Sequence, residues 1–140
     1  MAATRTFKSA GKFMRYFENR QGFYSVLDKV KVLSAGDGKC TCEMEISDEH
    51  LNAGETLHGG LTATLVDTIS TLAITTTECP PGMSTDINVT YMRPAKKGDT
   101  ISIVAECLKV GRTMAFVNVD IFNKSNGNKL IAQGRHTKLF

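Results

Sequence analysis

One long apolar stretch, residues 59–77, constrains the fold of this chain more than any other part of the sequence. Its small residues, mostly Thr, Ala and Ser, would let neighbouring backbone approach closely. The only charged side chain within it is Asp67. The larger apolar residues recur at steps of three and four, which is helical spacing, and they are Leu61, Leu65, Ile69 and Leu72. We therefore expect a helix that is buried on all sides and carries one carboxylate.

A carboxylate on a buried helix is costly unless it is hydrogen-bonded or paired, which makes Asp67 a candidate functional residue. At the helix start, Gly59 and Gly60 leave the first backbone N–H groups uncovered, where the helix dipole favours negative charge. These N–H groups are a candidate oxyanion hole.

The two candidate groups are too far apart to act on one small group within a single chain. Asp67 follows Gly59 by eight residues, which is about 12 Å along a helix axis. Two antiparallel copies of the helix across a two-fold axis would place Gly59 of one subunit opposite Asp67 of the other. We therefore expect a symmetric homodimer with two composite sites.

The composition fits one globular domain in a chain of 140 residues. The net charge of +3 is compatible with a phosphorylated small ligand and too weak to argue for a nucleic-acid partner. No apolar run approaches the roughly 20 residues of a transmembrane segment. The cysteines are spaced neither as a disulfide framework nor as a zinc site, so we expect reduced thiols in an intracellular compartment and no metal.

Residues 1–22 are basic and carry apolar residues, such as Phe13 and Phe17, at helical spacing. The expected structure is a helical extension that caps an open end of the fold. Basic, hydroxylated and acid-poor segments are also typical of mitochondrial presequences, and the two interpretations are compatible. The main domain is expected over residues 23–140.

Strands are expected on both sides of the central helix. Turn residues bound them at Gly36-Asp37-Gly38 and at Asn126-Gly127. In the clearest strand, Cys40 and Cys42 alternate with polar residues, which favours core packing for both thiols. The predicted strands are residues 24–33, 39–46, 83–92, 100–108, 113–122 and 129–137. An antiparallel sheet that curls around one buried helix accounts for this order.

This order of elements, with Asn52, His58-Gly59-Gly60 and Asp67 on and just before the helix, resembles the hotdog-fold acyl-CoA thioesterases. The similarity spans about residues 20–138 and points to the phenylacetate-pathway-like branch. It implies an α+β hotdog fold in which an antiparallel sheet of about six strands wraps around one long central helix, with an N-terminal capping helix. It also implies hydrolysis of acyl-CoA thioesters in homodimers that pair into a homotetramer. No metal or organic cofactor is implied, because coenzyme A is part of the substrate.

The resemblance assigns a role to each candidate catalytic residue. The Gly59 N–H would stabilise the oxyanion, and Asn52 would hold the carbonyl or the attacking water. Asp67 of the opposite subunit would activate the water or attack directly, and Ser84 would help to hold that water. His58 would contact the thioester or help the product to leave.

Each of these side chains also has a structural interpretation. Asn52 could be a turn residue, and His58 a hydrogen-bonding group at the helix start. Asp67 could satisfy a neighbouring backbone group or hydroxyl, and Ser84 could be an exposed strand residue.

The phosphates of coenzyme A need cationic or N–H partners. Arg93 and Arg112 are the positions where the resemblance leads us to expect the 3′-phosphate, although these basic residues could also be solvated sheet ends. The residues expected to contact the substrate or the coenzyme are Ser84, Asp86, Tyr91, Met92, Arg93, Pro94, Ala95, Lys96, Lys109, Val110, Gly111, Arg112, Thr113 and Lys138.

Bacterial members of this family prefer aryl-acetyl-CoA and animal members medium- to long-chain fatty acyl-CoA. Resemblance to the animal members favours the fatty substrates, and the expected location is the cytoplasm, with mitochondria as a second compartment. Hotdog dehydratases and hydratases are a rival class, but the Gly-Gly that follows His58 is typical of the thioesterases. A non-catalytic acyl-CoA-binding or sensing module is the other rival, and the isolated Asp67 argues against it.

Overall fold

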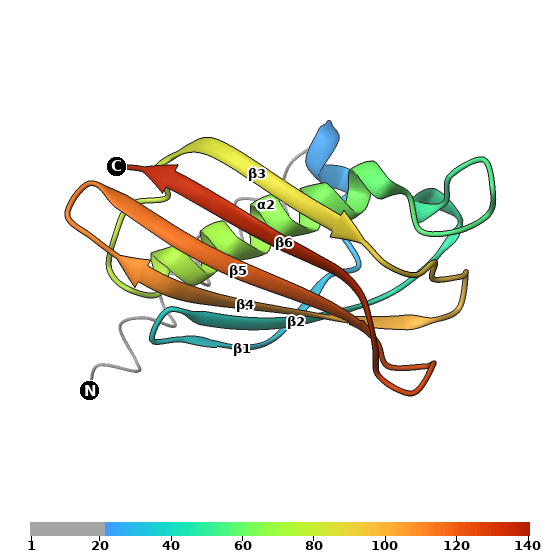
Figure 1. The fold of residues 1–140 in the computed structure, drawn as a ribbon. Coiled ribbons are helices and arrows are strands. Elements are labelled where there is room, and N and C mark those ends of the chain that lie inside the picture. The colour runs from blue at the N-terminus through green and yellow to red at the C-terminus, as the bar shows by residue number, and fades with distance from the viewer. Residues whose placement is uncertain (1–21) are drawn as a thin grey trace.

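One long helix, α2 (Gly59–Thr75), lies against the inner face of an antiparallel sheet that wraps around it (Figure 1). The computed structural model describes residues 22–140. The helix predicted for residues 1–22 therefore lies, except for Gly22, outside the described residues. The strands are β1 (Lys31–Gly36), β2 (Lys39–Glu45), β3 (Met83–Tyr91), β4 (Thr100–Val110), β5 (Met114–Asn123) and β6 (Lys129–Leu139). Two short 3-10 helices precede α2, and they are η1 (Phe23–Leu27) and η2 (Asp48–His50).

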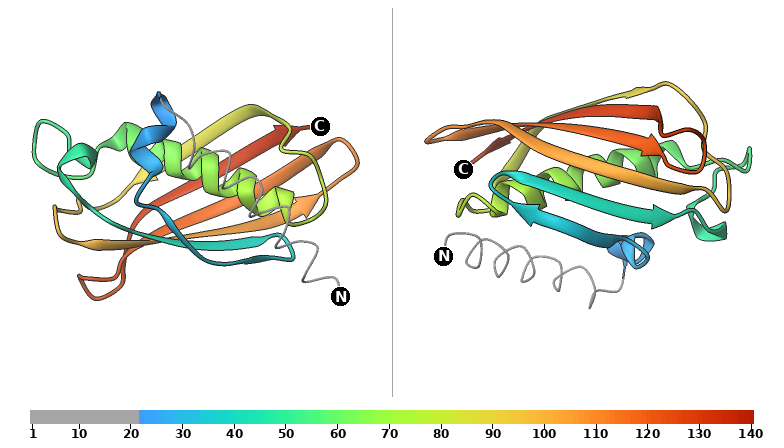
Figure 2. Two further views of the ribbon diagram at one scale, coloured as in Figure 1. Left: turned by 180° about the vertical axis from the view of Figure 1, so that it is seen from behind. Right: turned by 90° about the horizontal axis from the view of Figure 1, so that it is seen from below.

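The six strands are ordered β1-β2-β4-β5-β6-β3, and all neighbours pair antiparallel. Seen from below, the sheet lies over one side of α2 and curves down through β2 to β1 (Figure 2). The hotdog architecture predicted from the motifs is therefore confirmed for residues 22–140.

Helix α2 is buried along most of its length, as its composition predicts. Several of its hydroxyl side chains donate to the helix backbone; Ser70 Oγ and Thr71 Oγ1 both donate to the carbonyl of Asp67, at 2.9 and 2.7 Å. Asp67 departs from the burial of the rest of the helix, because 48% of its side chain is exposed. The prediction of a carboxylate buried within its own chain is wrong. Asp67 lies toward the β3 edge of the sheet, beyond which no described strand covers it.

The first predicted strand is also wrong over most of its length. Residues 24–33 were expected to alternate, but Phe23–Leu27 is a 3-10 helix and the strand begins at Lys31. Leu27 and Val30 are both buried, and the Val30 N–H donates to the Leu27 carbonyl at 3.0 Å. Burial at a spacing of three residues suits a turn of 3-10 helix rather than a strand.

The second strand and the turn before it follow the prediction. Asp37 and Gly38 both have positive φ, 51° and 76°, which makes the tight turn from β1 to β2. Cys40 and Cys42 are buried in the core with their sulfur atoms 3.7 Å apart. Core packing of these two thiols is therefore confirmed.

Strand β3 forms one edge of the sheet and pairs only with β6. Apart from Val89, its residues are exposed, and they include the large apolar side chains of Met83, Ile87 and Tyr91. An edge strand presents unpaired backbone N–H and C=O groups that can pair with another chain. Both the side chains and the backbone of β3 are therefore available for an intermolecular contact.

Candidate functional site

Side chains from α2, β3 and β6 meet at one place beside the exposed edge. His136 on β6 is buried, and its Nε2 lies 2.7 Å from Ser84 Oγ and 3.9 Å from Asp67 Oδ1. Its Nδ1 lies 2.6 Å from Ser70 Oγ. The structure thus brings together Asp67 and Ser84, which the sequence predicted, with His136, which it did not.

The hydrogen bonds around His136 fit one tautomer of the neutral ring. When Ser70 donates its only proton to the Asp67 carbonyl, His136 Nδ1 donates to Ser70 Oγ. In the neutral ring, Nε2 is then an acceptor, and Ser84 Oγ donates its proton to it. The lone pairs of Ser84 remain available to accept a hydrogen bond from another molecule.

The surroundings favour this neutral ring. Burial lowers the pKa of His136, and the positive charge of Lys138 lowers it further, while Asp67 and Asp86 act in the opposite direction. Asp67 and Ser84 approach the same ring nitrogen, whereas the acid and hydroxyl of a Ser-His-Asp triad occupy opposite nitrogens. The geometry therefore favours a serine that orients a small molecule rather than a nucleophile.

Lys138 was predicted to contact the coenzyme, and in the structure its side chain points inward. It is only 5% exposed, and its Nζ donates to Thr71 Oγ1 at 2.8 Å. Burial lowers the pKa of Lys138, opposed by the negative charge of Asp67. This ammonium group therefore belongs to the surroundings of Asp67 and His136.

The start of α2 forms a second group of candidate residues. The Gly60 N–H donates to His58 Nδ1 at 2.9 Å, so the imidazole caps the helix. Among residues 22–140, none accepts a hydrogen bond from the Gly59 N–H. Tyr91 Oη donates to the Gly59 carbonyl at 2.7 Å and holds β3 against this end of the helix.

Asn52 organises the loop before the helix. Its Oδ1 accepts from the backbone N–H groups of Gly54 and Thr56 at 2.9 and 3.1 Å, and its Nδ2 donates to Thr56 Oγ1 at 3.0 Å. One proton of the Nδ2 group has no acceptor among the described residues. Asn52 is thus a turn residue that retains a free donor.

The predicted coenzyme segments lie at opposite ends of α2 in one chain (Figure 1). Residues 91–96 adjoin the helix start, where the Leu57 N–H donates to the Ala95 carbonyl at 2.9 Å. Ala95 is buried, whereas the other members of this segment are exposed. Arg93 Nη1 donates to the Leu130 carbonyl at 2.6 Å.

The second coenzyme segment, residues 109–113, connects β4 to β5 near the other end of the helix. Gly38 links the end of α2 to β4, because its N–H donates to Thr76 Oγ1 and its carbonyl accepts from the Cys107 N–H, each at 2.8 Å. Lys109, Arg112 and Thr113 are exposed there, as a binding surface requires.

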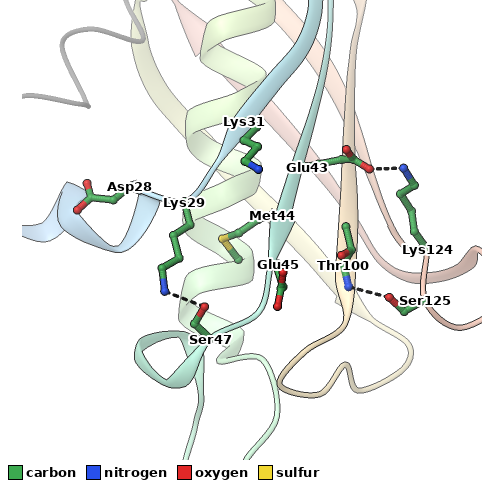
Figure 3. Close-up of a pocket in the computed structure, with 10 residues that line it drawn as sticks. All are labelled: Asp28, Lys29, Lys31, Glu43, Met44, Glu45, Ser47, Thr100, Lys124 and Ser125. Carbon is green, nitrogen blue, oxygen red and sulfur yellow. Dashed lines mark hydrogen bonds and ion pairs between the residues drawn. The ribbon is translucent and has the colours of Figure 1, made fainter.

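A separate pocket of about 880 Å³ opens beside β1 and β2 (Figure 3). Among its charged side chains, Lys124 pairs with Glu43, and Lys29 Nζ donates to Ser47 Oγ at 2.8 Å. It is lined by Asp28, Lys29, Lys31, Glu43, Met44, Glu45, Ser47, Thr100, Lys124 and Ser125. None of the predicted site residues lines it.

No set of three or more His, Cys, Asp or Glu side chains among residues 22–140 is placed to hold a metal ion. None of the helices described is both long and apolar enough to span a membrane.

The position of His136 could have been inferred from the pattern of β6. Residues 132, 134, 136 and 138 alternate with more exposed neighbours and face the helix. Once β6 is placed beside β3, this alternation puts His136 and Lys138 on the same inner face as Ser84. The missing signal was the strand order, which local patterns do not contain.

Comparison with known proteins agrees with this fold. The thioesterase superfamily model matches residues 54–129. Acyl-coenzyme A thioesterase 13 of Homo sapiens is 53% identical over 132 residues, covering 94% of this chain and 94% of that protein. The crystal structure of zebra fish thioesterase superfamily member 2 has a TM-score of 0.87 at 55% identity, covering 91% of this chain and 93% of that one.

A more distant solved structure holds the coenzyme. A hypothetical thioesterase protein from Streptococcus pneumoniae TIGR4, crystallised with coenzyme A, has a TM-score of 0.81 at 25% identity and covers 90% of this chain and 94% of its own. The chain therefore belongs to the thioesterase superfamily, and the hotdog-fold acyl-CoA thioesterases that its motifs resemble are confirmed as its family.

Proposed function

We propose that this chain hydrolyses acyl-CoA thioesters to a free acid and coenzyme A, at sites shared between two subunits. The observation that carries the proposal is that α2 holds two different half-sites. One is the Gly59 N–H, which has no acceptor among residues 22–140, and the other is the exposed Asp67 carboxylate beside Ser84 and His136. Coenzyme A in the Streptococcus pneumoniae relative supports this class of ligand.

The half-site at the helix start suits the carbonyl of the thioester. Negative charge develops on the carbonyl oxygen during attack, and the Gly59 N–H at the positive end of the helix can stabilise it. The free proton of Asn52 Nδ2 is a second donor from the adjoining loop.

The half-site at Asp67 suits a water molecule. Ser84 donates its own proton to His136, so its lone pairs can accept one proton of the water while Asp67 accepts the other. The water oxygen then attacks the carbonyl carbon as Asp67 takes its proton. When the tetrahedral intermediate collapses, the C–S bond breaks and the thiolate of coenzyme A recovers that proton.

Strand β3 explains how two half-sites can meet. Its first residues join the Asp67 half-site through Ser84, and its last residue, Tyr91, holds Gly59. If two β3 edges pair antiparallel across a two-fold axis, the Ser84 end of one strand lies beside the Tyr91 end of the other. The proposed homodimer therefore brings the Asp67 half-site of each subunit to the Gly59 half-site of its partner.

Further features of the proposal rest on the family resemblance. The substrates are medium- to long-chain fatty acyl-CoAs, with aryl-acetyl-CoA as the alternative, and the dimers pair into a homotetramer. The reaction needs no metal or organic cofactor. The protein acts in fatty acid metabolism, in the cytoplasm and also in mitochondria. The exposed residues of 91–96 and 109–113 contact the coenzyme.

The test is thiol release from a panel of acyl-CoAs, from phenylacetyl-CoA to palmitoyl-CoA, by the wild type and Asp67→Asn. We expect Asp67→Asn to keep the fold and substrate affinity and to lower kcat by about two to four orders of magnitude, as for a positioned base. Asp37→Asn is a matched control, because Asn tolerates the positive φ of this exposed turn. Near-normal turnover by Asp67→Asn would remove Asp67 from the mechanism.

Two further outcomes distinguish the alternatives. Tight binding of acyl-CoA without thiol release from any member of the panel would identify a non-catalytic binding module. Mixing Asn52→Ala with Asp67→Ala subunits should restore part of the activity, because some mixed dimers keep one intact site. No rescue after confirmed subunit exchange would refute the shared site.

A further inference from the structure

The buried ammonium group of Lys138 is costly for this fold. Its side chain is 5% exposed, and Thr71 Oγ1 is the only described group that accepts a hydrogen bond from it. A charge removed from water costs several kcal/mol unless it is paired and hydrogen-bonded. An apolar side chain would fill this place without that cost, so the positive charge itself calls for an explanation.

Lys138 is tied to the helical turn that carries Asp67. Thr71 accepts from Lys138 Nζ and donates to the Asp67 carbonyl. His136, two residues earlier on the same face of β6, is linked to the same carbonyl through Ser70. Two parallel chains of hydrogen bonds therefore attach Lys138 and His136 to the backbone of Asp67.

The charged groups around His136 come from three elements. Asp67 on α2 and Asp86 on β3 act on it electrostatically, as does Lys138 on its own strand, while the residue opposite on β5 is the apolar Val117. The two carboxylates favour a protonated imidazole. Lys138 is the cation that opposes them.

Protonation of His136 would damage the proposed reaction in two ways. A proton on Nε2 would be donated to Ser84 Oγ, which would take one of its two lone pairs and turn the Ser84 proton away from His136 toward the site of the water. The same imidazolium lies 3.9 Å from Asp67 Oδ1, so an ion pair would hold the carboxylate that serves as the base. The reaction therefore needs a neutral His136.

We propose that Lys138 is a positioning residue that keeps His136 neutral, and thereby keeps Ser84 and Asp67 free to hold the attacking water. This inference rests on the proposed function. Burial and Lys138 both lower the pKa of His136, in agreement with the geometry.

A purely structural role for Lys138 makes a different prediction. If the ammonium group only ties β6 to α2, Thr71→Val and Lys138→Met should have the same effect, because each removes the hydrogen bond. If its charge matters, Thr71→Val should leave the titration of His136 close to that of the wild type. Lys138→Arg should also do so, because it retains the charge.

The experiment is an NMR titration of the His136 imidazole in the full chain, with the signal assigned by its loss in His136→Gln. We expect the pKa of His136 to rise in Lys138→Met and Lys138→Gln and to change little in Lys138→Arg and Thr71→Val. An unchanged titration in a folded Lys138→Met or Lys138→Gln protein overturns the proposal. Equal shifts in Thr71→Val would overturn it in favour of the structural tie.

The pH profile of kcat/KM connects the titration to catalysis. In Lys138→Met the loss of activity on the acid side should begin at a higher pH than in the wild type, with KM nearly unchanged. A shifted titration with an unshifted profile overturns the positioning role. Absence of wild-type turnover refutes the proposed function instead, because the titration itself needs no activity.

Discussion

Helix α2 is packed so closely on β6 that one added methyl group should disturb both stability and catalysis. A Cβ atom at Gly134 would lie 2.5 and 2.6 Å from the two methyl groups of Val66 and 3.1 Å from its Cβ. Val66 is fully buried, and a valine in a helix has essentially one χ1 rotamer, so its methyl groups cannot turn away. In Gly134→Ala, the helix and the strand must therefore move apart by about 1 Å to reach an ordinary contact of about 3.5 Å.

The expected loss of stability follows from two opposing terms. Overpacking of a core costs about 1–3 kcal/mol. Replacing a glycine within a strand by alanine returns about 0.5–1 kcal/mol. The net destabilisation of Gly134→Ala should be about 1–2 kcal/mol, which lowers Tm by roughly 3–8 °C in a domain of this size.

Catalysis should suffer more than stability. Val66 immediately precedes Asp67, so a displaced helix moves this carboxylate away from Ser84 and His136. A misplacement of about 1 Å can lower turnover by about 10²-fold. Thermal unfolding at fixed protein concentration and thiol release from a fatty acyl-CoA measure the two effects.

A second substitution provides the control. Val66→Ala removes the clashing methyl groups, so the double variant Val66→Ala/Gly134→Ala should be less destabilised than the sum of the single variants by about 0.5–3 kcal/mol. Wild-type Tm and turnover in Gly134→Ala, or strictly additive losses in the cycle, would refute the close packing of α2 on β6.

Two further predictions concern the histidines. His58→Ala removes the acceptor of the Gly60 N–H and should cost about 0.5–2 kcal/mol of stability, while His58→Asn, a good N-cap, should recover it. Loss of turnover in a fully stable His58→Asn protein would show instead that the imidazole acts on the thioester. Burial lowers the pKa of His136, so the unfolded chain binds this proton more tightly, and the free energy of unfolding should fall as pH drops below about 6.5. Urea midpoints near neutral and acidic pH should therefore differ less in His136→Gln than in the wild type; equal differences would exclude His136 as a cause.

Local patterns predicted most of the elements correctly. The apolar spacing of residues 59–77 indicated α2, and the alternation around Cys40 and Cys42 indicated β2. Both patterns reflect how consecutive side chains project from a regular backbone, which depends on neighbours along the chain. The same reasoning failed for most of residues 24–33. Val30 and Val32 alternate with lysines as they would in a strand, but Phe23–Leu27 forms a 3-10 helix, and Leu27 and Val30 are buried three residues apart.

The amino-acid sequence by itself determined the central helix and the antiparallel class of the sheet, and it singled out Gly59, Asp67 and Ser84 as candidate site residues, since these depend on local periodicity and recognisable motifs. Only the tertiary structure decided what surrounds Asp67. The order β5-β6-β3 places His136 and Lys138 beneath one turn of α2, and the β3 edge leaves the carboxylate half exposed. These contacts join residues more than 60 positions apart in the chain, and pairing over such distances is set by the packing of whole elements, which no local pattern encodes.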